Sequence, residues 1–239
     1  MTLNVVGIVC ALAAEARHLG PTTQRREPLA SLADGTLLAV SGMGGGAAAL
    51  GARALIDAGA TALTSFGLAG GLDPALAAGA IFLPCEVMAL NGPSIVTARH
   101  WRERLSAAVA AHRPVAHGKL LSSPRAIGTV AEKAALFRET GAAAVDMESL
   151  AVAEVASTHQ LPFIAVRVIV DGAGDVLPRA VTAAADSAGH LQLWRLIGAL
   201  ARSPADLAPL IRLARRYRAA SRSLAVVARA GSLAPHAFS

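Results

Sequence analysis

The stretch Val145–Ser149 reads VDMES, and one short helix later Phe163–Asp171 reads FIAVRVIVD. The second stretch is apolar on both faces apart from Arg167, which is typical of a central strand in a sheet that is covered on both sides. Between the two stretches, apolar and small residues recur from Leu150 onward at a spacing that predicts a helix. A strand, a helix and a further buried strand in this order indicate an α/β fold.

These two stretches each carry a carboxylate at a chain position where ligands often bind. Glu148 precedes the predicted helix, and Asp171 ends the predicted strand. Ligands of open α/β sheets bind outside the carboxyl ends of the strands, so the two side chains are candidate site residues. The structural alternatives are that Glu148 complements the helix dipole and that Asp171 caps the turn before Gly172.

The same alternation of strands and helices continues outward in both directions. The predicted strands are Asn4–Cys10, Thr36–Ser41, Ala62–Gly67, Ala80–Met88, Gly118–Leu121, Ala142–Met147 and Pro162–Val170. The predicted helices are Ala13–Leu19, Ala47–Ala58, Trp101–Ala111, Val130–Thr140, Ser149–His159, Ala180–Ala201 and Ala205–Ala230. This pattern predicts one α/β domain with a central mixed, mostly parallel sheet covered by helices, followed by a basic amphipathic helix at the C-terminus. We place the domain at residues 1–202 and the arginine-rich helical tail at residues 203–239.

The composition agrees with a single well-packed domain. The 239 residues are 54% hydrophobic and 16% charged, which is enough to build one sizeable core. Cys10 and Cys85 lie in apolar segments without metal-ligand spacing, so we expect them to fill the core in a reducing compartment. The N-terminus lacks the charged region of a signal peptide, and no apolar run reaches the ~18 residues of a membrane span. We therefore expect a cytoplasmic protein.

The net charge of +6 comes from the tail. Residues 194–239 contain eight arginines and one acidic residue, whereas the first 193 residues contain 14 basic and 15 acidic residues. An arginine-rich amphipathic helix can lie on an anionic membrane surface, which would make the protein peripheral at the inner face of the membrane. The alternative is a docked helix with a solvated basic face. Nucleic acid is not favoured as a partner, because no aromatic interleaving or known binding module accompanies the arginines.

Two glycine-rich turns follow two of the predicted strands. They read SGMGGG at Ser41–Gly46 and FGLAGG at Phe66–Gly71. Glycines in such turns let the backbone present N–H groups to an anion or a sugar. Neither turn matches the dinucleotide fingerprint or the P-loop, and tight packing turns remain the alternative.

Taken together and in order, five segments of the chain resemble the nucleoside phosphorylase superfamily, in particular its methylthioadenosine/S-adenosylhomocysteine nucleosidase branch. The segments are Gly7–Glu15, Ser41–Gly44, Gly67–Gly71, Val145–Glu148 and Arg167–Asp171. The resemblance covers roughly Asn4 to Asp175. With its basic tail, the chain is similar to the hopanoid-associated phosphorylases, a subgroup thought to remove adenine from adenosylhopane.

The resemblance implies a role for each of three carboxylates. Asp171 would protonate purine N7 so that the base leaves neutral, which requires a carboxylic acid with a raised pKa. Glu15 would orient or deprotonate the attacking water, or bind a sugar hydroxyl if phosphate is the nucleophile. Glu148 would hold the ribose hydroxyls. Without the family, Glu15 reads equally well as a solvated glutamate in the first turn of a helix.

The resemblance also implies the apolar and glycine positions of the site. The residues expected to contact substrate besides Glu148 are Met147, Leu68, Ala69, Gly70 and Ile127. The residues expected to face the nucleophile or phosphate are Gly42, Met43 and Gly44. No metal and no organic cofactor is expected, phosphate is an alternative co-substrate, and a homo-oligomer is expected from the resemblance alone.

The sequence departs from the family pattern at three places. The arginine that phosphorylases use for phosphate before the second glycine turn is missing at Ser65-Phe66. The segment Ser122–Ile127 lacks the aromatic residue that nucleosidases place over the purine, and Val170 stands where a serine is common. Three functions therefore stay open: release of adenine from a nucleoside with an apolar 5′ substituent, by phosphorolysis or hydrolysis; a soluble methylthioadenosine/S-adenosylhomocysteine nucleosidase; and a catalytically weak nucleoside-binding protein.

Overall fold

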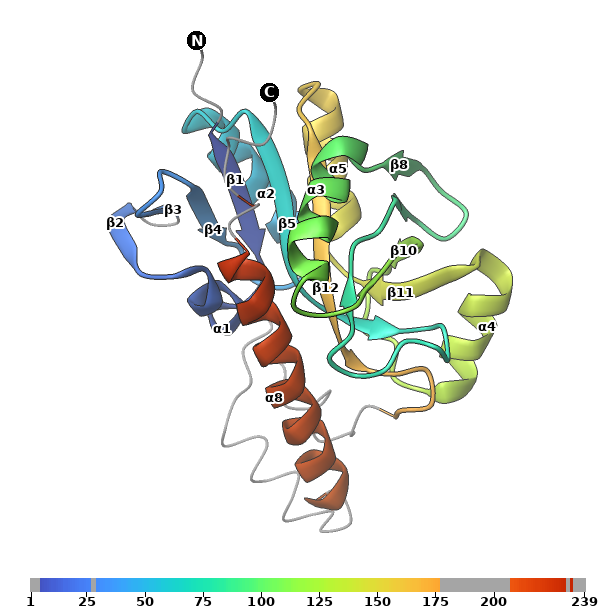
Figure 1. The fold of residues 1–239 in the computed structure, drawn as a ribbon. Helices are drawn as coiled ribbons and strands as arrows, with labels where there is room; N and C mark the ends of the chain where they lie inside the picture. The colour runs from blue at the N-terminus through green and yellow to red at the C-terminus, as the bar shows by residue number, and fades with distance from the viewer. Residues whose placement is uncertain (1–4, 27–28, 177–206, 231–232, 234–239) are drawn as a thin grey trace.

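A central sheet with helices on both faces forms the body of the protein (Figure 1). The structure is a computed structural model, and it describes residues 5–26, 29–176, 207–230 and 233. Within those residues the strands are β1 (Val6–Cys10), β2 (Thr22–Arg26), β3 (Leu29–Leu32), β4 (Leu37–Val40), β5 (Ala62–Gly71), β6 (Ile81–Phe82), β7 (Glu86–Met88), β8 (Ser94–Val96), β9 (Val115–Ala116), β10 (Lys119–Ser122), β11 (Ala142–Asp146) and β12 (Phe163–Asp171). The helices are α1 (Ala13–Ala16), the 3₁₀ helix η1 (Arg17–Leu19), α2 (Gly45–Asp57), α3 (Arg99–Ala110), α4 (Val130–Thr140), α5 (Ser149–Thr158) and α8 (Leu207–Arg229). The predicted fold class, a single α/β domain with a mixed and mostly parallel sheet, is confirmed.

The sheet branches at its longest strand, β5. The strands follow the order β2-β3-β4-β1-β5-β11-β10-β7-β8, while β12 pairs with β5 outside this order. Strand β12 runs parallel to β5 from the pair Leu63↔Phe163 onward, and β11 joins β5 antiparallel at its end. Gly70 is therefore paired with Val145 on one side and with Asp171 on the other. The branch point brings the ends of three strands to one place.

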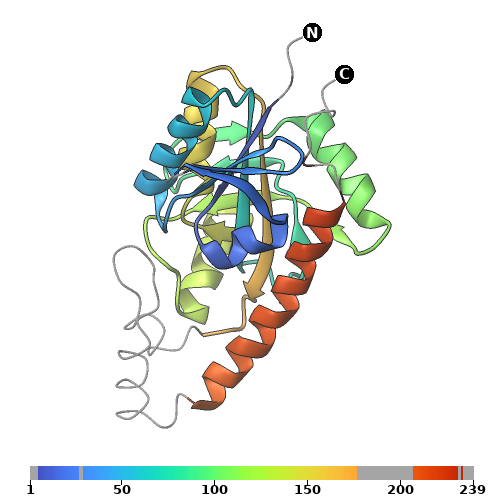
Figure 2. The same ribbon diagram turned by 90° about the vertical axis from the view of Figure 1, so that its left-hand side faces the viewer.

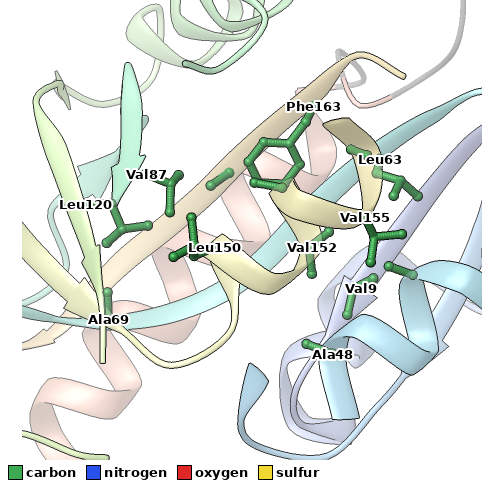
Figure 3. Close-up of a cluster of buried hydrophobic side chains, with 14 of the residues drawn as sticks. Val9, Ala48, Leu63, Ala69, Val87, Leu120, Leu150, Val152, Val155 and Phe163 are labelled. Atoms are coloured by element: carbon green, nitrogen blue, oxygen red, sulfur yellow. The ribbon is translucent and has the colours of Figure 1, made fainter. Parts of the chain in front are cut away.

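Two helices cover each face of the sheet. Figure 2 shows α2 and α5 side by side on one face, and α3 and α8 on the other. On the first face the core is aliphatic apart from Phe82 and Phe163, and the close-up in Figure 3 shows Phe163 among aliphatic side chains. On the second face Trp101 and Leu105 of α3 share a cluster with Leu224 and Val227 of α8. Because helices cover both faces, β5 and β12 can be apolar along almost their whole length.

Helix α8 packs on the sheet with its C-terminal half. Ala220, Leu224 and Val227 are buried, and the Ser223 hydroxyl donates to the Gly79 carbonyl at 2.7 Å. A 2.6 Å ion pair joins Arg216 to Asp175 in the turn after β12. The predicted helix Ala205–Ala230 is thus found as α8, and its buried face agrees with a docked helix. The predicted division into residues 1–202 and 203–239 stays a prediction, since the boundary lies outside the described residues.

Some of the predicted elements differ from the observed ones. The strand predicted over Ala80–Met88 is interrupted at Leu83–Cys85, because Pro84 cannot donate to a strand ladder, and it forms β6 and β7. The sequence did not predict β2, β3, β8 or β9, which are short strands of two to five residues. The helix predicted over Ala180–Ala201 lies outside the described residues.

None of the described helices is long and apolar enough to cross a membrane.

Candidate active site

A pocket of about 210 Å³ lies at the branch point of the sheet, and Glu15, Glu148 and Asp171 all line it. It is formed by the start of α1, the end of β5, the β11–α5 junction and the end of β12. Of the other predicted site residues, the structure brings Met43, Leu68, Ala69, Gly70, Ile127 and Met147 into the same lining. The sequence analysis missed the further lining residues Ala11, Leu12, Arg125, Ala126, Val145 and Asp146 and did not assign Val170 to the site.

Glu15 is buried and is held by backbone donors. Its side chain is 4% exposed, which excludes a solvated glutamate. Oε2 accepts the Leu12 N–H at 2.9 Å, as in a capping box, and Oε1 accepts the Leu68 N–H at 3.0 Å. Burial raises the pKa of Glu15 above its ordinary value, while Arg167 and the backbone donors act in the opposite direction. A buried carboxylate with a raised pKa is suited to take up a proton.

Gly67 provides the space that the Glu15 carboxylate occupies. A Cβ atom at Gly67 would lie 2.7 Å from Oε1 and 2.9 Å from Cδ of Glu15, closer than van der Waals contact allows. The first glycine of the second turn therefore serves the site by leaving room for a side chain. The sequence had suggested that these glycines serve backbone geometry.

Glu148 lies at the N-cap of α5, as its place before the helix predicted. Its Oε1 accepts the Gly44 N–H at 2.7 Å, which joins α5 to the first glycine turn. Its side chain is 9% exposed. Burial and the neighbouring Asp146 raise the pKa of Glu148, and Arg167 lowers it.

The first glycine turn lies close to the pocket, but not all of its residues line the pocket. Met43 lines the pocket, whereas Gly42 and Gly44 do not. Gly44 has φ +94°, and its N–H is already bound to Glu148. The predicted role of Gly42, Met43 and Gly44 towards a nucleophile stays a prediction.

Asp171 ends β12 and is paired with a lysine. Its side chain is buried, and Oδ2 accepts a hydrogen bond from the Lys133 ammonium of α4. Burial raises the pKa of Asp171 above its ordinary value, and Lys133 opposes this shift. The sequence analysis missed Lys133. The sequence did contain a signal for it. The spacing of Lys133 to Leu136 and Phe137 places it on the face of α4 that packs inward.

A buried polar network supports the β11–α5 junction behind the pocket. Asp146 accepts the Arg167 Nε–H at 2.9 Å, the Ser149 N–H at 3.0 Å and the Ser122 hydroxyl at 2.5 Å. The Arg167 guanidinium also donates to the Ser65 hydroxyl at 2.6 Å. Arg167 is buried, and it lies beside Glu15 and Glu148 in the lining of a small adjoining cavity. Its charge lowers the pKa values of Glu15 and Glu148.

One cationic side chain lines the pocket among the described residues. Arg125 contributes to the wall and forms an ion pair with Glu132 of α4. It lies in the segment Ser122–Ile127, where the family resemblance had led us to expect an aromatic residue. Within the described ranges, no cluster of His, Cys, Asp and Glu is arranged to hold a metal ion.

A larger cavity of about 660 Å³ lies between α1, η1 and the β2–β3 hairpin. Arg17 is the ionisable residue among those that line it, and the rest are small, apolar or hydroxyl-bearing. A cavity with a single ionisable group has no acid–base pair. The smaller pocket is therefore the candidate active site.

Comparisons with known proteins show which proteins the chain is similar to. A family model described as "Phosphorylase superfamily" matches residues 6–195. No curated protein sequence matches the chain. The fold matches several solved structures at low sequence identity.

Three of these structures illustrate the match. The 5′-methylthioadenosine/S-adenosylhomocysteine nucleosidase from Neisseria meningitidis, in complex with methylthio-immucillin-A, is 18% identical, with a TM-score of 0.70 over 96% of this chain and 99% of that chain. The enzyme of the same name from Helicobacter pylori is 19% identical, with a TM-score of 0.66 over 73% and 88%. Futalosine hydrolase from Helicobacter pylori is 18% identical, with a TM-score of 0.65 over 72% and 86%.

Proposed function

Because the chain belongs to the phosphorylase superfamily, and is thereby a nucleosidase or phosphorylase, we propose that it hydrolyses the N-glycosidic bond of an adenine nucleoside. The observation that carries this proposal is the convergence of three buried carboxylates, Glu15, Glu148 and Asp171, on one pocket. We choose adenine as the base because the nucleosidases among the solved structures with the same fold are named for adenosine derivatives.

Each carboxylate has a separate task in the proposed reaction. Asp171, in its protonated form, donates to purine N7 as the bond between C1′ and N9 breaks, and the bond's electron pair leaves with the base. Glu148 accepts hydrogen bonds from the ribose hydroxyls and fixes the sugar. Glu15 takes a proton from water as the water oxygen bonds to C1′. The products are the neutral base and the free sugar, so atoms and charge balance.

The charges in the pocket favour water over phosphate as the nucleophile. Glu15 and Glu148 would both repel a phosphate dianion. Among the described lining residues, the cation is Arg125, which pairs with Glu132. The Gly44 N–H, which could have bound phosphate, donates to Glu148.

Adenine release with and without phosphate tests this proposal. We expect release that does not depend on phosphate, and a fall in kcat of about 10²-fold or more for Asp171→Asn, because one general acid contributes that much. Asp57→Asn, an exposed carboxylate at the end of α2, is the matched control and should keep full activity. Release that requires phosphate would make the protein a phosphorylase. No release under either condition would favour the nucleoside-binding protein.

We further propose that the 5′ substituent of the nucleoside is large and apolar. Apart from the carboxylates and Arg125, the lining consists of apolar and glycine residues, including Met43, Leu68 and Val170. Adenosylhopane is a substrate of this class, in keeping with the resemblance to hopanoid-associated phosphorylases. The runner-up is 5′-methylthioadenosine or S-adenosylhomocysteine.

A series of 5′-deoxy-5′-alkyl adenosines distinguishes the two substrates. Each buried methylene contributes about 0.8 kcal/mol, or about fourfold in kcat/KM, if the 5′ chain is bound on an apolar surface. A rise in kcat/KM along the series supports the large substituent. A maximum at 5′-methylthioadenosine supports the runner-up.

A further inference from the structure

Lys133 connects the candidate general acid to two other parts of the chain. It is the one fully buried side chain of α4. Its ammonium donates to Oδ2 of Asp171, to the Gly172 carbonyl at 2.8 Å and to the Asp175 carbonyl at 3.1 Å. An ammonium has three N–H donors, and all three are used. Lys133 therefore fixes the end of β12 and the turn that follows it.

This contact leaves the two Asp171 oxygens in different situations. Oδ2 is engaged by Lys133, whereas Oδ1 accepts no hydrogen bond from any residue that the structure describes. Gly70 lies behind both oxygens, since a Cβ atom there would be 3.5 Å from Oδ2 and 3.6 Å from Oδ1. Because Asp171 also lines the pocket, Oδ1 is the oxygen left for a substrate atom.

The charged groups around Asp171 form two pairs. Those that act on it are Lys133 from α4, Asp175 from the following turn and Arg216 from α8. Asp175 and Arg216 pair with each other at 2.6 Å, so Lys133 remains as the direct partner of Asp171. The Lys133–Asp171 pair is buried.

The residue type at position 133 is unusual for this chain. The sequence contains 20 arginines and two lysines, Lys119 and Lys133. An arginine would neutralise Asp171 equally well, yet it does not release its proton in proteins, whereas a buried lysine can. The chain thus has the cation that can give up a proton at the place where the reaction consumes one.

On the basis of the proposed hydrolysis, we infer that Lys133 is the positioning residue of Asp171 and replaces the proton that Asp171 passes to the purine. As the C1′–N9 bond breaks, the protonated Oδ1 of Asp171 donates its proton to N7, and the electron pair of the bond leaves with the neutral base. In the same step Oδ2 takes a proton from Lys133 Nζ, so Asp171 stays a neutral acid and Lys133 becomes a neutral amine. After the base has left, solvent protonates Oδ1 and the Oδ2 proton returns to Nζ, so every proton is accounted for.

The test compares three variants of the full chain in steady-state adenine release. Lys133→Arg keeps the ion pair and withholds the proton, while Lys133→Met keeps the length of the side chain and removes both. We expect kcat to fall by about 10²-fold in both Lys133 variants, because the loss is in the chemical step. Their KM values should stay within about threefold of the wild-type value. Lys119→Arg is the control, since Lys119 lies on the surface near Glu86 and is outside the pocket lining.

The pH profile separates proton supply from a structural role. We expect the wild-type kcat to stay level through neutral pH, because Lys133 replaces the proton that Asp171 gives to the purine. In Lys133→Met, Asp171 alone must stay protonated, and kcat should fall as pH rises through the titration of that carboxyl. A purely structural lysine would lower the melting temperature of the variant and leave the shape of the profile unchanged.

Two results would overturn the inference: a Lys133→Arg enzyme with kcat within about threefold of the wild type, or a Lys133→Met enzyme with the wild-type pH profile. Thermal unfolding measures how much of each variant is folded. With rates expressed per folded molecule, a loss of folding is not mistaken for a loss of catalysis. If the proposed function itself is wrong, the wild type and Lys119→Arg will release no base at all. This result differs from both results that would overturn the role of Lys133.

Discussion

Glu15 and Glu148 are buried carboxylates that are held mainly by backbone N–H groups. Glu15 binds the N–H groups of Leu12 and Leu68, and Glu148 binds that of Gly44. Backbone donors fix the orientation of a carboxylate without fully neutralising it, so burial still raises both pKa values. The neighbouring residues that leave space for the Glu15 and Glu148 carboxylates are therefore as important for the site as their hydrogen-bond donors.

Gly67→Ala should displace Glu15 and reduce activity. The added Cβ would lie 2.7 Å from Oε1, and the carboxylate can yield only by leaving the Leu68 N–H. We expect kcat to fall by about 10²-fold, the contribution of a general base. Steady-state kinetics measures this, with Gly46→Ala as the control because a Cβ there meets no atom within 4 Å. Unchanged kcat in Gly67→Ala would show that Glu15 is not needed in its observed position.

Glu148→Gln should change how stability depends on pH. The raised pKa means that the folded protein holds this proton more tightly than the unfolded chain does, so the free energy of unfolding falls as pH rises from the ordinary carboxyl range through the raised pKa. Glutamine keeps an oxygen for the Gly44 N–H and cannot titrate. The variant should gain stability relative to the wild type with rising pH, by about 1.4 kcal/mol for each unit of the shift. Urea unfolding from pH 4 to pH 8 measures the difference; a constant difference would contradict the assignment.

At the scale of elements, the arginine-rich helix α8 has two parts with different surroundings. Its C-terminal half packs on the sheet, whereas Ile211 is 47% exposed and the side chains of Arg212, Arg215 and Arg218 are exposed. Figure 1 shows the N-terminal end of α8 extending beyond the strands. A basic, partly apolar helix end of this kind supports the proposal of peripheral contact with an anionic membrane.

Replacing the exposed arginines of α8 by glutamine should weaken binding to anionic vesicles. The variant changes Arg212, Arg215, Arg218 and Arg222, and the control removes the same charge elsewhere, at Arg53, Arg104, Arg113 and Arg138. Each basic residue near an anionic surface contributes about 1 kcal/mol. Co-sedimentation with phosphatidylserine vesicles is therefore expected to be lost in the first variant alone. Equal binding of both variants would favour a solvated basic face. Removal of α8 is a poorer test, because Leu224 and Val227 belong to the core.

The elements that the sequence could predict are those whose pattern is local. Strand β12 is apolar on both faces, and helix α4 is bounded by the Thr129 cap and by Gly141 in the left-handed region. The β2–β3 hairpin could not be predicted, since its polar strand TTQRR owes its structure to pairing with β3 at the sheet edge. Lys133 was missed for a similar reason: its partner Asp171 is 38 positions away along the chain.

At the scale of the whole molecule, the family resemblance predicts a homo-oligomer. Light scattering should give a mass that is a multiple of the 24.2 kDa chain. Leu50 on α2 is 66% exposed, and large exposed apolar side chains are common where subunits meet. Leu50→Arg should therefore lower the mass, while Arg53→Glu on the same helix keeps it. A monomeric wild type would contradict the prediction.

The branched sheet also determines when the pocket can form during folding. Its walls come from segments around residues 15, 68, 127, 148 and 171, and Gly70 pairs with two strands that are distant from it in the chain. Closing such long loops is slow, because chain entropy must be lost before the contacts form. The α/β layers on either side can assemble earlier from neighbouring segments. We therefore expect catalytic competence to return late in refolding, once the last long-range strand pairing is complete.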